Sequence, residues 1–411
     1  MPGSVLPDRP SRRRARVCAG MATATLVVVV LAVTLVPGSA VEGGACLACG
    51  NFALADAILN LVLFVPLGIG LAMLLPRYVW LPVALAVGLS TGIELAQLLL
   101  PGRYATLADV VANGTGAAIG AGLVRHAGRP RAPAESREAV AWGRALFPVL
   151  ASIVSLTLLA PSFPRTSWYG EWTPDLGRLG RYEGTVLEAS IGNDAFLPGR
   201  LPDAVVARRR LAAGDVLETT VVGVPATGRL APVLAIHDEA GREILFLGVD
   251  ASDLVGRLRR LAAGLRLKSP EARLPGGAPG PGETTRLGMR LDGKDICLSR
   301  PGVERCDRIA SPSRGWVLLM GMREDLFFRA RRVFDVLWTA LLFFPLGLGL
   351  RREASAGILP AVAALGAVLV VTLFSDAGAA PWTLAGAGAG LMAGRVAGRF
   401  LPRPLAPLNG N

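Results

Sequence analysis

The sequence predicts an α-helical integral membrane bundle of about eight spans, with an all-β sandwich domain inserted between two of them. Apolar residues make up 52% of the 411 residues, and charged residues only 18%. The apolar residues collect in blocks long enough to cross a bilayer, and a stretch of short alternating segments interrupts these blocks. A chain of several ordinary soluble domains is therefore excluded.

Eight apolar segments are the expected membrane spans. They cover roughly residues 21–39, 54–75, 80–100, 105–124, 145–161, 333–350, 356–374 and 382–396. The first segment also fits a cleaved signal peptide, because an arginine-rich region precedes it and Pro37-Gly38-Ser39-Ala40 follows. The topology of the remaining chain is the same in either case.

Arginine placement predicts the orientation in the membrane. Arginines cluster before the first, third, fifth and seventh spans and after the last one, and all these loops fall on one side of an eight-span protein. The positive-inside rule makes this side the cytoplasm, with both termini there and residues 164–328 outside a bacterial plasma membrane. An exception to this rule is the group Arg329, Arg331 and Arg332, which precedes the sixth span on the outer side. Because a long domain precedes these arginines, they contribute less to the orientation. Because the net charge of +12 lies largely in such loops, no nucleic-acid partner is expected.

The domain organisation includes an internal repeat. A shift of 279 residues aligns Asp56 with Asp335, together with a Phe-x-Pro-x-Gly-x-Gly motif that follows both. Glycines spaced by four residues in the fourth and eighth segments favour close helix packing. The predicted parts are a basic cytoplasmic N-terminus 1–20, a membrane unit 21–125, a basic linker 126–144, a span 145–163, the β domain 164–328, a second membrane unit 333–398 and a cytoplasmic tail 399–411.

The cysteines agree with this topology. Cys46 and Cys49 lie in the first outer loop, and Cys297 and Cys306 lie in the outer domain, so the four form two candidate local disulfides. A redox role for the first pair is the alternative, although no βαβ pattern surrounds it.

Polar side chains gather at the outer ends of the first unit's spans. Inside lipid, each one needs a partner or a purpose. The residues that share helix faces there, together with a loop arginine, are Asp56, Asn60, Ser90, Glu94, Gln97, Arg103, Asp109 and Asn113. They predict an outward-facing binding pocket in which Arg103 reaches over Glu94, Asp109 or an anionic ligand. The alternative is a hydrogen-bond network that only fixes the bundle.

Catalytic chemistry has limited support. Glu94 and Asp109 are the candidates for acid or base catalysis, but no nucleophile accompanies them. The chain has two histidines, His126 and His237, in separate regions of the sequence. We therefore expect no metal and no cofactor.

The motif set is similar to that of a known family. It consists of Asp56-x3-Asn60-x3-Phe64-x-Pro66-x-Gly68, then Ser90-x3-Glu94-x2-Gln97, then Pro101-Gly102-Arg103-x5-Asp109-x3-Asn113-Gly114. Over about residues 20–125 it resembles the VanZ-like membrane family, named for a protein associated with resistance to the glycopeptide teicoplanin. The resemblance implies a multi-pass envelope protein linked to glycopeptide resistance or envelope maintenance. The second unit keeps Asp335 but has Thr339, Thr372 and Ser375 at polar positions, and resembles a degenerate copy.

The inserted domain shows the rhythm of short strands. Candidate strands cover residues 185–191, 216–222, 233–236, 243–249, 284–291, 295–298 and 316–320. Their order resembles concanavalin-like, laminin-G-type jelly rolls, many of which bind glycans. We interpret the aromatic group Trp168, Tyr169 and Trp172 as an interfacial belt. Asp250 and Asp253 are more typical of a turn than of a calcium site.

The leading functional hypothesis is non-enzymatic. The outer domain recognises an envelope glycan or peptidoglycan-related ligand, coupled to the polar pocket, and the lipid bilayer is the other partner. The alternatives are a membrane enzyme that acts on a lipid-linked substrate at the outer leaflet, with Glu94 or Asp109 as acid or base, and a transporter.

Overall fold

The computed structural model describes residues 9–36, 44–47, 52–101, 103–127, 134–176, 179–225, 228–293, 295–321, 330–350 and 354–400. The chain divides into two compact units, Met1–Ala134 with Arg399–Asn411 and Glu135–Gly398. Each unit has its own apolar core among the helices, around Phe64 in the first and around Phe343 in the second.

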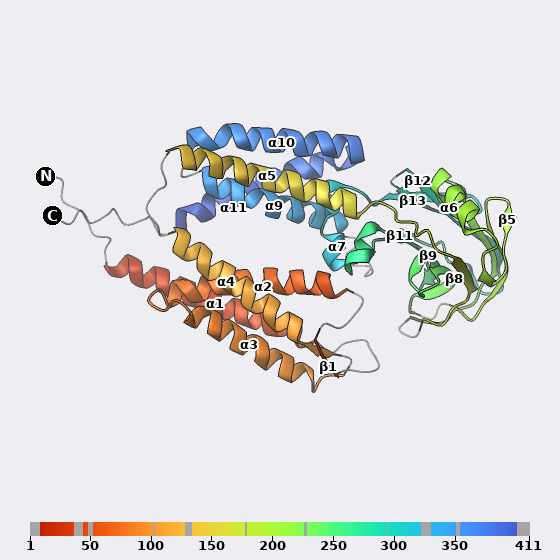
Figure 1. Ribbon diagram of the computed structural model, residues 1–411, viewed down its shortest axis with the longest axis horizontal. Helices are drawn as coiled ribbons and strands as arrows, with labels where there is room; N and C mark the ends of the chain where they lie inside the picture. Colours follow the sequence, from red (N-terminus) through yellow and green to blue (C-terminus); the bar gives the residue numbers. More distant parts are fainter. Residues whose placement is uncertain are drawn as a thin grey trace. The chain divides into compact units, whose positions relative to one another are not determined.

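The predicted apolar segments are helices. Within the described residues they are α1 Arg9–Thr34, α2 Ala53–Leu74, α3 Leu81–Gln97, α4 Leu107–Ala127, α5 Ala134–Leu158, α9 Arg331–Leu350, α10 Ala354–Asp376 and α11 Ala380–Phe400 (Figure 1). The described stretches that are long and apolar enough to cross a bilayer are Ala53–Leu74, Leu107–Arg125, Glu138–Leu158, Arg331–Leu350 and Gly357–Gly398. The helices Ala19–Thr34 and Leu81–Gln97 are apolar but shorter. A helical membrane part is thus confirmed, and eight spans remain a prediction.

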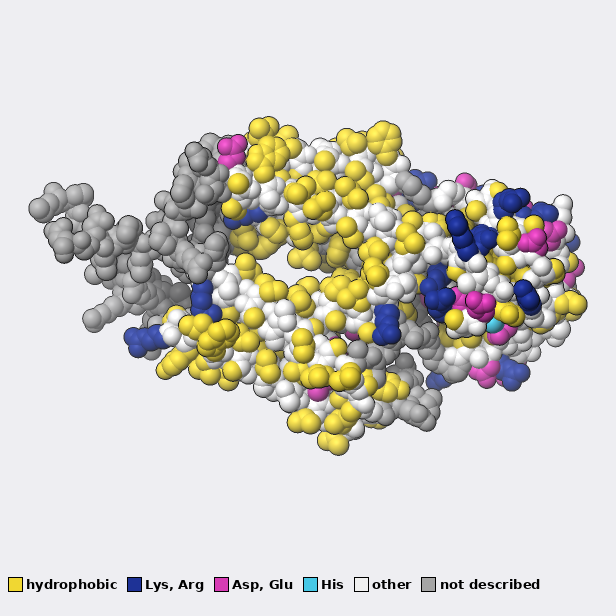
Figure 2. Space-filling view, viewed as in Figure 1, with side chains coloured by type: hydrophobic (Ala, Val, Ile, Leu, Met, Phe, Trp, Pro, Cys, Tyr) yellow, Lys and Arg dark blue, Asp and Glu magenta, His cyan; other side chains and the backbone are white. Residues whose placement is uncertain are grey.

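The surface of the helices has the character expected for contact with lipid. Hydrophobic side chains cover them, whereas charged side chains gather on the β part of the second unit (Figure 2). Leu85 on α3 and Val111 and Leu123 on α4 are all exposed. A helix of a water-soluble domain would turn such residues toward a core.

In the first unit, α2 and α4 approach each other to backbone contact. A Cβ atom at Gly116 would meet the carbonyl oxygen of Leu61, and one at Gly120 would meet that of Val65. Glycine is therefore required at both positions, as in small-residue helix contacts of membrane proteins. This contact fixes the position of α4 relative to α2, and with it the positions of the side chains at the ends of both helices.

The second unit repeats this contact. Gly390 on α11 faces the carbonyl oxygen of Ala340 on α9, and Gly394 faces that of Phe344. Ala340 and Phe344 lie 279 residues beyond their counterparts in α2. The internal repeat seen in the sequence is therefore also a repeat of helix packing.

The inserted region contains two six-stranded sheets. The first has the order β11-β10-β9-β8-β3-β6, with β3 Trp168–Trp172, β6 Gly199–Arg200, β8 Ala231–Asp238, β9 Glu243–Asp250, β10 Asp253–Leu258 and β11 Glu271–Leu274. The second has the order β14-β13-β12-β7-β4-β5, with β4 Thr185–Ile191, β5 Asp194–Ala195, β7 Leu217–Val222, β12 Thr284–Asp292, β13 Asp295–Arg300 and β14 Val303–Arg308.

These two sheets pack face to face. All pairings between neighbouring strands are antiparallel, and a Cβ at Gly256 of β10 would meet Leu298 and Met289 from the opposite sheet. The domain also contains the helix α6, Ala204–Ala213. Asp203 caps it by accepting hydrogen bonds from the backbone N–H groups of Val205 and Val206.

The aromatic group at residues 168–172 is not an interfacial belt, so that interpretation was wrong. It forms strand β3, and Trp168 is fully buried. Its indole N–H donates to the carbonyl oxygen of Pro164 over 3.1 Å, and its ring lies 6.0 Å from that of Phe163. Trp residues occur in domain cores as well as at membrane surfaces, and here burial and strand pairing place Trp168 in the core.

The strand predicted at residues 316–320 is also wrong, because Val317–Met320 is the short helix α7. Gly321, with a φ of +75°, ends this helix. The indole of Trp316 donates to the Asp335 carboxylate over 2.9 Å, and this contact directs the segment toward α9. A short apolar run does not by itself distinguish a strand from a helix.

Within the second unit, polar contacts join the β sheets to the helices. Arg331 at the start of α9 bonds to Asp307 of β14 over 3.0 Å. Arg308 of β14 lies 3.9 Å from Asp376 at the end of α10. With the bond from Trp316 to Asp335, these contacts tie the edge of one sheet to α9 and α10.

The glycine contact between α2 and α4 gives a testable expectation. Gly116→Ala should reduce the stability of the first unit by about 1–3 kcal/mol, because the Leu61 carbonyl group cannot make room without a backbone shift. Hydrogen exchange of α2 and α4, measured on the full chain in lipid nanodiscs, reports the change.

Gly122→Ala on the same helix is the matched control. A Cβ there meets nothing within 4 Å, so exchange should be unchanged or slightly slower. Equal exchange rates in the two variants would show that the backbone contact is not a constraint.

Candidate functional site

The residues predicted to form a pocket occupy three helices and one loop of the first unit. Asp56 and Asn60 lie in the first two turns of α2, and Arg103 lies in the loop before α4. The residues on α3 and α4 are Ser90, Glu94, Gln97, Asp109 and Asn113, and four of these, Ser90, Glu94, Gln97 and Asn113, are buried.

A buried hydrogen bond connects α3 to α4. The Asn113 side-chain amide donates from Nδ2 to Ser90 Oγ over 2.8 Å, and both residues are at most 3% exposed. The other amide atom, Asn113 Oδ1, is buried and has no hydrogen-bond partner among the residues that the structure describes. Since an unsatisfied buried acceptor costs free energy, this oxygen is a place where a ligand donor or a water would be stabilised.

Glu94 and Asp109 meet through Thr106. The backbone N–H of Thr106 donates to Glu94 Oε2 over 2.7 Å, and Thr106 Oγ1 accepts from the backbone N–H of Asp109 over 3.1 Å. The second bond is an N-cap of α4, formed by a Thr-x-x-Asp sequence. Asp109 and Arg103 are also the charged groups that act electrostatically on the Glu94 carboxyl group.

Arg103 has a more local role than the sequence suggested. Its Nε donates to the carbonyl oxygen of Val36 over 2.7 Å, just beyond the end of α1. Gln97 Nε2 likewise donates to the carbonyl oxygen of Thr34 over 2.9 Å. Both side chains therefore satisfy carbonyl groups at the C-terminal end of α1, and Arg103 remains close enough to influence Glu94.

Two short strands hold the loop in place. β1 Gly44–Cys46 pairs in parallel with β2 Tyr104–Thr106, and Ala108 N–H donates to the Leu47 carbonyl oxygen over 3.0 Å. Cys46 is disulfide-bonded, and Cys49 lies outside the described residues. This pairing places Thr106 beside Glu94.

We use the name polar cluster for Ser90, Glu94, Arg103, Thr106, Asp109 and Asn113. The hydrogen bonds and electrostatic contacts described above do not include Asp56, which is exposed, or Asn60, which is half-buried. The structure links Ser90, Glu94, Arg103, Asp109 and Asn113 of the predicted residues, while Gln97 bonds to α1. Thr106 was missed, although the Thr-x-x-Asp spacing before a helix is a recognisable capping signal.

The equivalent positions in the second unit are satisfied by protein groups. Thr372, Ser375 and Thr383 donate to carbonyl groups three or four residues earlier in the chain. Asp335, 2% exposed, accepts from Trp316, and its other oxygen lies 3.7 Å from Arg314 Nε. The second unit therefore presents no counterpart of the polar cluster among the residues described in it.

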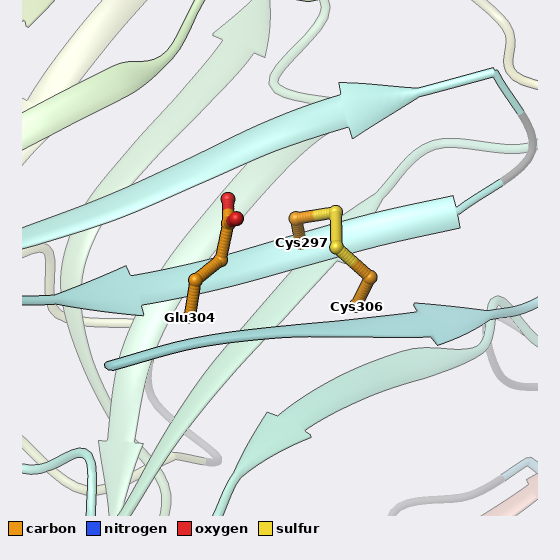
Figure 3. Close-up of side chains that lie close together, drawn as sticks. All are labelled: Cys297, Glu304 and Cys306. Atoms are coloured by element: carbon orange, nitrogen blue, oxygen red, sulfur yellow. A yellow bond between two sulfur atoms is a disulfide. The ribbon is translucent and has the colours of Figure 1, made fainter. Parts of the chain in front are cut away.

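The β domain contains one close group of potential metal ligands among its described residues, Cys297, Glu304 and Cys306 (Figure 3). Cys297 and Cys306 form a disulfide between the paired strands β13 and β14. Metals bind thiolates, whereas both sulfur atoms are used in this bond. Glu304 accepts two hydrogen bonds from Arg290, at 2.8 and 3.3 Å. The three side chains are therefore engaged within the protein, and the disulfide joins β13 to β14 covalently.

Asp250 and Asp253 bind an arginine rather than forming an acidic pocket. Arg273 lies 2.7 Å from Asp250 and 3.8 Å from Asp253, and its side chain is 3% exposed. A guanidinium at this position supplies the positive charge that a calcium ion would bring. The carboxylates are thus part of the internal ion pairing of the domain.

Comparison with known proteins agrees with the motif in the first unit. Residues 18–128 match the model of the VanZ/LLP1 family. No curated protein and no solved structure matches the chain. The matched range contains every residue of the polar cluster, and residues 18–128 therefore form a VanZ-like domain within a larger membrane protein.

Proposed function

We propose that the polar cluster of the VanZ-like domain binds the polar headgroup of a ligand in the bacterial cell envelope. We further propose that the β domain recognises an envelope glycan or peptidoglycan-related polymer outside the cell. The role is recognition rather than catalysis, and it links the protein to glycopeptide resistance or envelope maintenance.

The contrast between the two repeats carries this proposal. Both share the same glycine contacts between helices, and the described part of the second unit has no counterpart of Glu94, Arg103 and Asp109, so these three residues are not needed to bring the helices together. The VanZ-like domain nevertheless keeps Glu94, Arg103 and Asp109 together, next to a buried Asn113 oxygen without a partner. Ionisable groups in a membrane domain that packing does not require favour a binding role.

Binding is favoured over catalysis by the partners of Glu94. One carboxylate oxygen of Glu94 is held by the backbone N–H of Thr106. The two hydroxyl groups of the polar cluster are also engaged, since Ser90 Oγ accepts from Asn113 and Thr106 Oγ1 accepts from the backbone N–H of Asp109. An acid or base needs a reacting group within hydrogen-bond reach. An enzyme acting on a lipid-linked substrate, with Glu94 or Asp109 as acid or base, is the competing proposal.

The first expected outcome concerns the polar cluster. Glu94→Gln and Arg103→Ala should each weaken ligand binding about tenfold or more, because a hydrogen bond to a charged group contributes about 1.5–3 kcal/mol. In a glycopeptide-susceptible bacterium that expresses the protein, the minimum inhibitory concentration of teicoplanin should fall to the level without the protein.

Thr91→Val on the same helix is the matched control. Thr91 is exposed and donates to the carbonyl oxygen of Val87, so this variant should behave like wild type. Immunoblots must show equal amounts of protein in the membrane. Loss of folded protein in both cluster variants would support a purely structural role of the cluster.

A cavity supports the proposed role of the β domain. It has a volume of about 460 Å³ and lies between the β5–β6 region and α6. Its lining combines apolar side chains, including Phe196 and Leu201, with the polar side chains of Asn193 and Asp194. A few polar groups in an apolar concave surface are typical of small-ligand sites.

Asn193→Ala should weaken binding to purified peptidoglycan about 3–10-fold, the loss expected for one neutral hydrogen bond. The measurement is co-sedimentation of the full chain, in nanodiscs, with insoluble wall material. Glu239→Gln, an exposed substitution in the β8–β9 turn, is the control and should bind like wild type. If no wall polymer sediments the wild-type protein, glycan recognition is wrong.

Both proposals require the β domain and the polar cluster to face outward. Reporters active only in the cytoplasm or only outside should place fusions after Arg129 and at Asn411 inside, and a fusion after Gly264 outside. The arginine-rich loops predict this pattern. A cytoplasmic signal at Gly264 would invert the protein and exclude an envelope ligand.

A further inference from the structure

One segment of the β domain is bonded to the end of a membrane helix. The 3-10 helix η1, Leu261–Leu265, follows β10, and the N–H of Leu261 donates to the carbonyl oxygen of Ala160 over 3.0 Å. Pro161 forms an isolated bridge with Arg260. The apolar, membrane-length stretch of α5 ends at Leu158, so η1 lies directly beyond the end of this stretch.

The junction is fixed by a buried arginine. Arg260 is fully buried, and its Nη1 donates to the carbonyl oxygen of Leu159 over 3.1 Å. Burial lowers the pKa of Arg260 to about 10. The position of η1 relative to the end of α5 is therefore set by packing and not only by the backbone contacts.

Two exposed side chains of η1 are large and apolar. Leu261 and Leu265 are 45% and 50% exposed, while Ala262 between them is buried. The two leucines stand on a segment that is hydrogen-bonded to Ala160, two residues beyond the end of α5. Exposed apolar side chains beside the end of a membrane-length apolar helix favour a bilayer as the partner that covers them.

An exposed basic side chain lies beside these leucines. Arg266 is exposed at the end of η1, whereas Arg259, before η1, is half-buried and its Nη1 donates to the carbonyl oxygen of Glu243 over 3.4 Å. Arg266 adopts a left-handed backbone conformation, with a φ of +56°, and its N–H ends the 3-10 helix on Ala262 and Ala263. A bulky residue in this conformation is uncommon, and here it holds a cation beside the exposed leucines.

We propose that η1 is an interfacial anchor that binds an anionic lipid surface. Leu261 and Leu265 enter the boundary between headgroups and acyl chains, and Arg266 lies among the lipid phosphates. Exposed apolar side chains beside an arginine are the usual chemistry of monotopic membrane contact. The anchor holds the β domain against the leaflet, independently of any ligand of the polar cluster or of the cavity.

Photo-crosslinking of the full chain tests the anchor. The variant Leu265→p-benzoylphenylalanine is reconstituted in nanodiscs of phosphatidylglycerol and phosphatidylcholine that contain radiolabelled lipid. Leu197→p-benzoylphenylalanine is the control, because Leu197 is 75% exposed and follows β5, at the sheet edge opposite β14. The lipid adduct at position 265 should exceed that at position 197 at least tenfold, and equal yields would overturn the proposal.

The charged part of the proposal has its own test. Arg266→Glu, introduced beside the crosslinker at position 265, should lower the adduct yield severalfold in anionic nanodiscs and leave it unchanged in purely zwitterionic ones. A yield that does not depend on the lipid charge would exclude recognition of anionic headgroups. An unchanged disulfide and melting temperature show that each variant is folded.

Discussion

The backbone contact between glycines and carbonyl groups is the constraint on which the membrane part depends. Gly116 and Gly120 allow α4 to lie directly on α2, and Gly390 and Gly394 do the same for α11 on α9. In lipid, where burial of apolar surface gives little preference for one packing over another, close contact of this kind specifies which helices are neighbours. The fixed frame then determines which polar side chains at the helix ends meet.

The two repeats share the same helix packing but differ in their polar residues. In the VanZ-like domain, Thr106 caps α4 and also donates to Glu94, so a single residue couples helix initiation to the placement of a carboxylate. In the second unit, Asp335, which aligns with Asp56 in the repeat, accepts from Trp316. The aspartate position of the repeat is therefore exposed and outside the polar cluster in the first unit, whereas in the second unit it binds the segment that follows the β domain.

The β domain depends on the membrane helices of its own unit. Its edge strand β14 is joined to β13 by the Cys297–Cys306 disulfide and to α9 through Asp307. Ion pairs replace apolar contacts along this edge, and such pairs contribute through correct geometry more than through net energy. A domain held at α5, α9 and α10 has restricted freedom, so its cavity and its η1 face are presented in a defined way relative to these helices.

The sequence by itself determined the helices, the repeat, the family resemblance and half of the strands in the two sheets, because hydropathy and glycine spacing are local features of the sequence. The sequence also identified Glu94, Asp109, Ser90 and Asn113 as candidate site residues. Only the tertiary structure decided that Arg103 bonds to the end of α1, that Asp56 is exposed, and that Thr106 joins the site. The tertiary structure also showed that Trp168 is a core residue and not a surface residue, and that residues 317–320 form a helix and not a strand. These features depend on contacts between distant segments, and local propensity carries no information about such contacts.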